Sequence, residues 1–123
     1  MPHPLWKQKV QEIFGSQKVP EVTSNNLKTF RDHLRSNLEE PCYLFISSDD
    51  GAQFEAVLLV DYLEDVDHSK GILVTVKRTS DDKAFTVPLA QLECPPEDTD
   101  NHSLVEAYSS WFIRSVFQDM WTP

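Results

Sequence analysis

The sequence predicts an α+β fold: a small, bent antiparallel β-barrel of four or five strands, SH3- or Sm-like, with two N-terminal helices and one C-terminal helix. Apolar residues recur at helical spacing near both ends of the chain, and short apolar runs separated by turn signals occupy its middle. A chain of 123 residues, 40% of them hydrophobic, can bury the core of one domain. We therefore expect a single domain, 1–123, with an N-terminal helix and linker over 1–23, a core over 24–117 and a tail over 118–123.

The three helices are predicted from their end signals as well as from their apolar faces. The first should begin at Pro4 and end at Gly15, because proline suits a first helical turn and glycine suits a helix end. The second should take Ser24 as its N-cap and stop before Pro41. The third should open with a capping box over Ser103–Glu106.

The middle of the chain has the period of short strands. Phe54–Leu63 is almost continuously apolar, which predicts a central strand buried on both faces and favours a barrel over a flat meander. Ser48–Gly51 has the composition of a hairpin turn. The predicted strands are Cys42–Ser47, Phe54–Leu63, Gly71–Arg78, Ala84–Val87 and a short Leu89–Cys94.

Composition and charge exclude several classes of function. A net charge of −9 argues against nucleic acid and against anionic membrane surfaces. No apolar run reaches the roughly 18 residues of a membrane span. The chain lacks a nucleophile elbow and a glycine-rich phosphate loop, so we expect no enzymatic activity. Two distant cysteines, Cys42 and Cys94, predict reduced, part-buried thiols in a soluble cytoplasmic protein.

The charge is unevenly distributed along the chain. Residues 39–67 hold nine carboxylates and no lysine or arginine, whereas residues 1–38 hold six basic and three acidic side chains, a local +3. The repulsion within 39–67 must be relieved by solvent screening, by a basic partner or by a bound cation. The asymmetry also favours packing of the N-terminal helices against the acidic part of the same molecule.

The loop after the central strand carries the best signal for a cation. Asp65-x-Asp67-x-Ser69 matches the first three ligand positions of an EF-hand loop. Lys70 then stands where that loop needs glycine, and Val76 where it needs the bidentate glutamate, so an EF-hand is excluded. A calcium site between two strands stays open, with Asp65 and Asp67 as core ligands helped by Glu64 and Asp61.

Strand order predicts two acidic clusters at opposite ends of the sheet. In a meander, the start of the first strand lies beside the end of the second, so the residues before Pro41 should approach the Asp61–Asp67 loop. The simpler interpretation, that acidic turns are only soluble turns, stays open too. The first cluster would add Glu39 and Glu40 to the loop, and a weaker second site would comprise Asp49, Asp50, Asp81 and Asp82.

Two sequence boxes resemble a known family. Pro88-Leu-Ala-Gln-Leu-Glu93 and, after an acidic spacer, Tyr108-Ser-Ser-Trp111-Phe112 are similar to boxes of the small acidic calcium-binding proteins of cyanobacteria. The resemblance extends from about Leu27 to Phe112. It implies helices around a small β-barrel that binds Ca2+ without EF-hands and buffers or senses cytosolic calcium. The ligands it implies are Glu64, Asp65 and Asp67, with Asp61 less surely aligned.

A protein-interaction module is the alternative from a different class. An SH3- or Tudor-like barrel with aromatic residues near an acidic rim suits a basic partner and needs no metal. Tyr43, Phe54 and Tyr62 are the candidate contacts.

Overall fold

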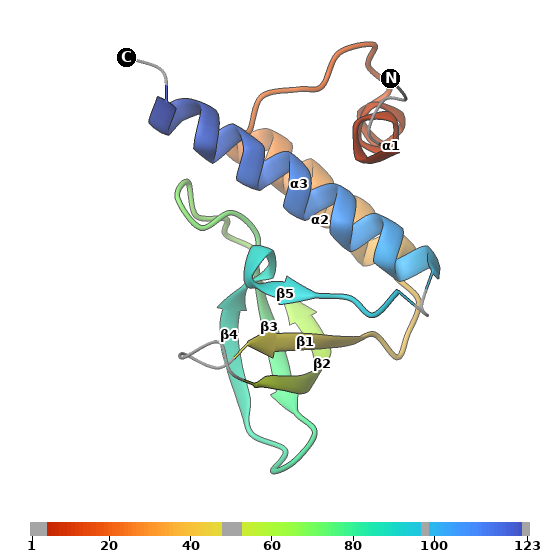
Figure 1. Ribbon diagram of the computed structural model, residues 1–123, viewed down its shortest axis with the longest axis vertical. Coiled ribbons are helices and arrows are strands. Elements are labelled where there is room, and N and C mark those ends of the chain that lie inside the picture. Colours follow the sequence, from red (N-terminus) through yellow and green to blue (C-terminus); the bar gives the residue numbers. More distant parts are fainter. Residues whose placement is uncertain (1–4, 48–52, 97–98, 122–123) are drawn as a thin grey trace.

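The structure is a computed structural model that describes residues 5–47, 53–96 and 99–121. Figure 1 shows the helices gathered at one end of the sheet, with a long helix lying across that end. In chain order the elements are α1 Leu5–Phe14, α2 Ser24–Asn37, β1 Tyr43–Ser47, β2 Phe54–Tyr62, β3 Leu73–Arg78, β4 Ala84–Pro88, the 3-10 turn η1 Leu89–Gln91, β5 Leu92–Glu93 and α3 Thr99–Trp121.

The five strands form one antiparallel sheet in the order β4-β3-β2-β1-β5. The α+β class, the three helices and the five strands are therefore confirmed. Within the described ranges, β4 and β5 remain the two edges, so the hydrogen-bonded sheet is not closed into the barrel that we expected. One reason is the length of β5, which has two residues where the sequence suggested six, because η1 takes up the start of that run.

One hydrophobic core joins the helices to the inner face of the sheet. The ring of Phe30 from α2 stacks on Trp111 from α3 with the centroids 5.2 Å apart. The Trp111 indole N–H also donates to the carbonyl of Pro20 at 2.8 Å, which fastens the linker after α1 to α3. Aromatic packing of this kind adds to area burial by about 0.5–1.5 kcal/mol per pair.

The prediction that the central strand is buried on both faces is wrong. Along β2 only Val57 is fully buried, while Phe54 and Val60 are exposed. The register between β2 and β3 shifts between Leu59 and Asp61, which marks a bulge at Val60. β2 is central in strand order, but it is covered on one face only.

Two helix starts differ from the predicted ones. Thr23, and not Ser24, caps α2, since its hydroxyl accepts the Asn26 N–H at 3.1 Å. α3 begins at Thr99, so Ser103 lies inside the helix and the predicted capping box is wrong. A serine three residues before a glutamate also occurs within helices, where the two face each other across a turn.

The remaining predictions on chain segments have mixed outcomes. α3 continues to Trp121, so most of the predicted tail over 118–123 is helical backbone. Pro4, the Ser48–Gly51 turn and the start of the Glu97–Asp100 spacer lie outside the described residues. Cys42 and Cys94 are buried thiols, as expected. Across the described part of the chain, no helix combines the length and the apolar character needed to cross a membrane.

Candidate functional site

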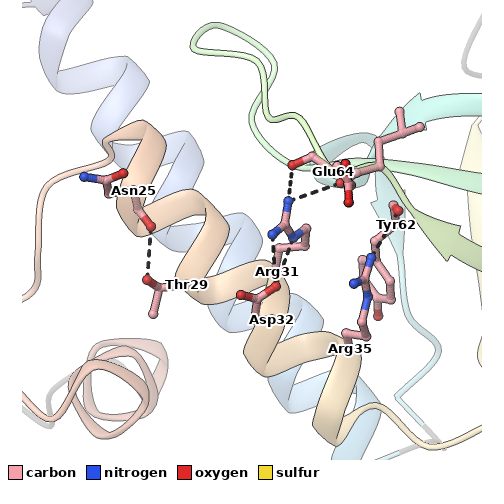
Figure 2. A network of polar contacts seen from close by, with 8 residues as sticks. Asn25, Thr29, Arg31, Asp32, Arg35, Tyr62 and Glu64 are labelled. Carbon is pink, nitrogen blue, oxygen red and sulfur yellow. Dashed lines mark hydrogen bonds and ion pairs between the residues drawn. The ribbon is translucent and has the colours of Figure 1, made fainter.

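Two arginines of α2 lie beneath the acidic loop between β2 and β3 (Figure 2). The Arg31 guanidinium donates to the carbonyl oxygens of Leu63 and Glu64, and its side chain is only 11% exposed. One turn later, Arg35 donates to the Tyr62 carbonyl at 3.2 Å. The guanidinium carbon of Arg35 lies 5.5 Å from the centre of the Tyr62 ring. Helix α2 thus contacts the acidic segment of its own chain, as the charge asymmetry predicted for the N-terminal helices, whereas α1 packs chiefly against α3.

These contacts bear on the chemistry of the loop. Backbone carbonyls are common calcium ligands, yet here guanidinium groups occupy three consecutive carbonyls, those of Tyr62, Leu63 and Glu64. A positive charge next to the loop also lowers its attraction for a cation. Part of the relief of repulsion that the sequence demanded therefore comes from α2.

Asp67 organises the tip of the same loop. Its Oδ1 accepts three hydrogen bonds, from the Ser69 hydroxyl at 2.7 Å, the Ser69 N–H at 2.8 Å and the Lys70 N–H at 2.9 Å. Its backbone pairs with Gly71 in both directions. The Ser69 hydroxyl, followed by the two backbone N–H groups, holds the pKa of the Asp67 carboxyl below its usual value. The spacing that resembled an EF-hand is, in this structure, the spacing of a tight turn.

The structure brings together only part of the first predicted cluster. Glu39, Glu40 and Asp61 line one hollow, as strand order predicted, while Glu64, Asp65 and Asp67 are not among its lining residues. Within the described residues, no group of three or more His, Cys, Asp or Glu side chains has the arrangement of a metal site. The Asp61 carboxylate accepts the Tyr62 N–H at 2.8 Å.

The second predicted cluster lies only partly within the described residues. Asp49 and Asp50 lie outside the described residues. Asp81 accepts the Lys83 N–H at 3.0 Å and lies 3.9 Å from the Arg78 guanidinium. Asp82 has a positive φ of 61° and lies 3.8 Å from the Lys77 ammonium. Both residues belong to the turn between β3 and β4 and form exposed ion pairs. Exposed ion pairs contribute at most about 1 kcal/mol each to stability.

The hollow has a volume of about 140 Å³ and lies where α2 ends and β2 bulges. Part of its wall is apolar and part is acidic. Tyr62 is half-buried there, and burial, followed by the nearby Cys42 and Glu40, raises the pKa of its hydroxyl against the opposing effect of Arg35. The lining residues are Arg35, Leu38, Glu39, Glu40, Cys42, Leu59, Val60, Asp61 and Tyr62.

Asn101 positions the acidic edge of this hollow from α3. It is fully buried, and its side chain both accepts the Glu39 N–H at 2.8 Å and donates to the Glu39 carbonyl at 3.0 Å. This two-way bond ties the segment after α2 to the first turn of α3. The sequence offered one signal for it, an asparagine beside the Tyr108 box, but no reason to assign it a role near Glu39.

Aromatic side chains gather on the solvent side of β1 and β2. Residues directly opposite each other in an antiparallel pair share a face, and the register pairs Tyr43 with Leu58, Phe45 with Ala56 and Ser47 with Phe54. Tyr43 is 47% exposed, Phe45 36% and Phe54 63%. We call this side the outer face, defined by Tyr43, Phe45, Phe54, Ala56 and Leu58.

Two of the three aromatic contacts that the sequence suggested therefore lie on the outer face. The third, Tyr62, lies in the hollow. Phe45 was missed because it stands in a run that reads as core. Its alternation with the buried Leu44 was the available signal, since neighbours along a strand face opposite sides.

Comparisons with models of protein families, with curated proteins and with solved structures gave no match to this chain.

Proposed function

We propose that this protein is a non-enzymatic protein-interaction domain whose outer face binds a basic partner. The observation that carries the proposal is the row of solvent-exposed aromatic residues, Tyr43, Phe45 and Phe54, on one face of β1 and β2. A cytoplasmic location belongs to the same proposal and is supported by the two buried thiols.

Exposed aromatic groups on a sheet face have a physical cost that a partner would remove. Single apolar side chains are common on surfaces, but a contiguous set with aromatic residues is typical of an interaction site. Tyrosine and phenylalanine are also enriched at the centres of protein interfaces. Charge adds selectivity, because a molecule of net charge −9 attracts basic partners and repels acidic ones.

An SH3-like form of the sheet is part of this proposal. Its support is the strand order β4-β3-β2-β1-β5 together with the 3-10 turn η1 between β4 and β5. Small open barrels of this type present an aromatic surface to extended peptides. The outer face of β1 and β2 is the corresponding surface here.

A peptide panel tests the proposal. We expect basic peptides that contain apolar residues to shift the amide NMR signals of residues 43–47 and 54–60, and acidic peptides of equal apolar content not to. Replacing Tyr43, Phe45 and Phe54 together by serine should weaken binding at least about tenfold, or about 1.4 kcal/mol.

Ile113→Ser is the matched control, because Ile113 is an exposed apolar residue of α3, away from the sheet. The Ile113→Ser variant should bind the basic peptides as tightly as the unchanged protein does. Equal binding by the triple variant, or equal binding of acidic and basic peptides, overturns the proposal.

Calcium binding is our second proposal, and it includes membership of the acidic calcium-binding family that the sequence resembles. The observation that favours it is that Glu39, Glu40 and Asp61 line one hollow. Their carboxylates do not have the arrangement of a metal site in the described residues, so a bound ion would have to draw them together. Carboxylates from separate segments are the ligands that Ca2+ prefers. Its ligands would be these three groups rather than Asp67, whose Oδ1 already accepts three hydrogen bonds.

Calorimetry separates the calcium proposal from simple screening. We expect heat on addition of CaCl2 that persists in excess MgCl2 and that Glu40→Gln with Asp61→Asn abolishes. Asp65→Asn with Asp67→Asn removes the same charge from the loop and serves as the comparison. No heat and no thermal shift at millimolar calcium would falsify this proposal.

A further inference from the structure

We infer that the hollow beside β2 receives one lysine side chain of the partner. This inference rests on the proposed function, since it names the group of the partner that enters next to the outer face. The hollow is a cavity of about 140 Å³ with two kinds of wall.

The walls match a group that is apolar along its length and positive at its end. Leu38, Leu59 and Val60 are its apolar lining residues, while Glu39, Glu40 and Asp61 are its acidic ones. A lysine side chain has this division, because four methylene groups precede its ammonium. The stem would contact the apolar wall, and the ammonium would contact the carboxylates.

The charges in the hollow leave room for one more cation. Three acidic residues and a single cation, Arg35, line the hollow, and Arg35 already donates to the Tyr62 carbonyl and lies over the Tyr62 ring. Among the ion pairs formed within the described ranges, none uses Glu39, Glu40 or Asp61. An entering ammonium therefore meets carboxylates that have no competing ion pair in that part of the chain.

The hollow adjoins the outer face, so one partner segment can use both. Val60 lines the hollow, is 53% exposed, and follows Leu58 of the outer face by two residues on β2. Cys42 and Leu59 line the hollow from the core side of the two strands. The Leu59 N–H donates to the Cys42 carbonyl at 3.0 Å, which fixes the two strands at this point. A peptide that lies along Phe45 and Tyr43 therefore reaches the hollow past the exposed Val60, at the end of the outer face.

The lining also predicts which modified lysines bind. Recognition of methylated lysine uses a cage of several aromatic rings. Among the lining residues that the structure describes, only Tyr62 is aromatic, and Arg35 already covers it. We therefore expect unmodified lysine to bind better than trimethyl-lysine, which has lost its hydrogen-bond donors.

Two probes test the inference. The first is a basic peptide that binds the outer face, with each lysine replaced in turn by norleucine, arginine or trimethyl-lysine. At one position norleucine should weaken binding at least tenfold to the unchanged protein and make little difference to the Glu40→Gln, Asp61→Asn variant. The control variant, Glu12→Gln with Glu21→Gln, changes the net charge equally and leaves both the hollow and the outer face intact, so it should keep the full lysine preference.

The second probe is Nα-acetyl-lysine methylamide, which needs no partner sequence. We expect it to shift the amide signals of residues 59–62 in the unchanged protein, and the norleucine analogue not to. One outcome is that peptides bind the outer face while norleucine weakens binding equally in the unchanged protein and in the Glu40→Gln, Asp61→Asn variant. In that case the lysine inference is wrong and the proposed function stands. If no peptide binds and the lysine amide still shifts these signals, the proposed function fails and the hollow remains a lysine site. If neither the peptides nor the lysine amide binds, both the lysine inference and the proposed function are wrong.

Discussion

A single buried asparagine controls where the acidic edge of the hollow lies. Asn101 makes two hydrogen bonds to the backbone of Glu39, 62 residues earlier in the chain. We predict that Asn101→Ala lowers the free energy of unfolding by about 1–3 kcal/mol, because two backbone groups lose their partner. Urea denaturation measures the change. Asn37→Ala, at an exposed position near the end of α2, is the control and should stay within about 0.5 kcal/mol.

If Asn101→Ala and Asn37→Ala lower the free energy of unfolding equally, the two hydrogen bonds between Asn101 and the Glu39 backbone have no special role in stability. A second measurement addresses position rather than stability: the amide signal of Glu39 should move in Asn101→Ala and stay in place in Asn37→Ala.

Asp67 gives the loop a pH dependence that can be worked out from its hydrogen bonds. Its folded pKa lies below the ordinary value of 3.8, chiefly because the Ser69 hydroxyl donates to the carboxylate. A carboxyl with a lowered pKa stabilises the folded state above its unfolded pKa, and that contribution is lost as the pH falls through the folded value. We predict that Ser69→Ala raises the Asp67 pKa toward its ordinary value in a carboxyl NMR titration.

Ser16→Ala is the control for this titration, since Ser16 is an exposed serine of the linker after α1. It should leave the Asp67 pKa unchanged. An unchanged pKa in Ser69→Ala would show that the hydroxyl contributes nothing to it.

At the scale of elements, Gly71 joins the β2–β3 loop to α3. Its φ is +80°, and an added Cβ would lie 2.3 Å from the Tyr108 hydroxyl and 2.9 Å from the Phe112 ring. The same hydroxyl accepts the Ile72 N–H at 2.8 Å. The loop therefore approaches the helix so closely that only glycine fits at this point.

We predict that Gly71→Ala costs more stability than the same change at Gly15. Gly15 also has a positive φ, +61°, but no atom lies within 4 Å of its added Cβ. Gly15→Ala should therefore cost about 1–2 kcal/mol of conformational strain. Gly71→Ala should add about 1–3 kcal/mol of overpacking against α3. Equal losses of unfolding free energy in Gly71→Ala and Gly15→Ala would mean that α3 moves away from the added methyl group at position 71 without cost.

Helix α2 has two roles: it packs into the core and it contacts the acidic segment. Its apolar stripe of Leu27, Phe30 and Leu34 is fully buried. Directly after Phe30 and Leu34, Arg31 and Arg35 reach the start of the β2–β3 loop and the end of β2. Residues four apart lie on one side of a helix, so both arginines face the same loop. The basic partner demanded by the acidic segment is thus partly internal.

At the scale of the whole molecule, the net charge of −9 should make stability depend on salt. Screening acts over about 8 Å at physiological ionic strength and weakens the repulsion among exposed carboxylates. We predict that NaCl raises the urea midpoint. MgCl2 and CaCl2 at matched ionic strength are the controls, since a larger effect of calcium alone supports the calcium proposal. A midpoint that falls with NaCl would show that the ion pairs outweigh the repulsion.

Most of the elements could be predicted, and the reasons are local. The buried alternation of Ile72, Val74 and Val76 predicted β3, and the stripe of α2 predicted its core face. Boundaries were less predictable. Ser24 and Thr23 are both good caps, and only the backbone conformation, extended at Thr23, decides between them.

The candidate site could be predicted only in part. The order of β1 and β2 was enough to bring Glu39 and Glu40 toward Asp61, because an antiparallel pair joins these chain ends. The role of Asp67 could not be predicted, since one spacing of oxygens serves both a metal loop and a tight turn. The exposure of Phe45 was equally hidden, because an apolar run does not say whether both faces of its strand are covered.

By itself the sequence determined the α+β class, the single core and the crowding of nine carboxylates without a base between residues 39 and 67. These follow from periodicity and composition, which act along the chain. Only the tertiary structure decided what answers those charges: Arg31 and Arg35 reach the acidic segment from another element, Arg78 pairs with Glu55, and Glu39, Glu40 and Asp61 line one hollow. The physical reason is that electrostatic relief depends on distances through space, and those are set by packing between segments far apart in sequence.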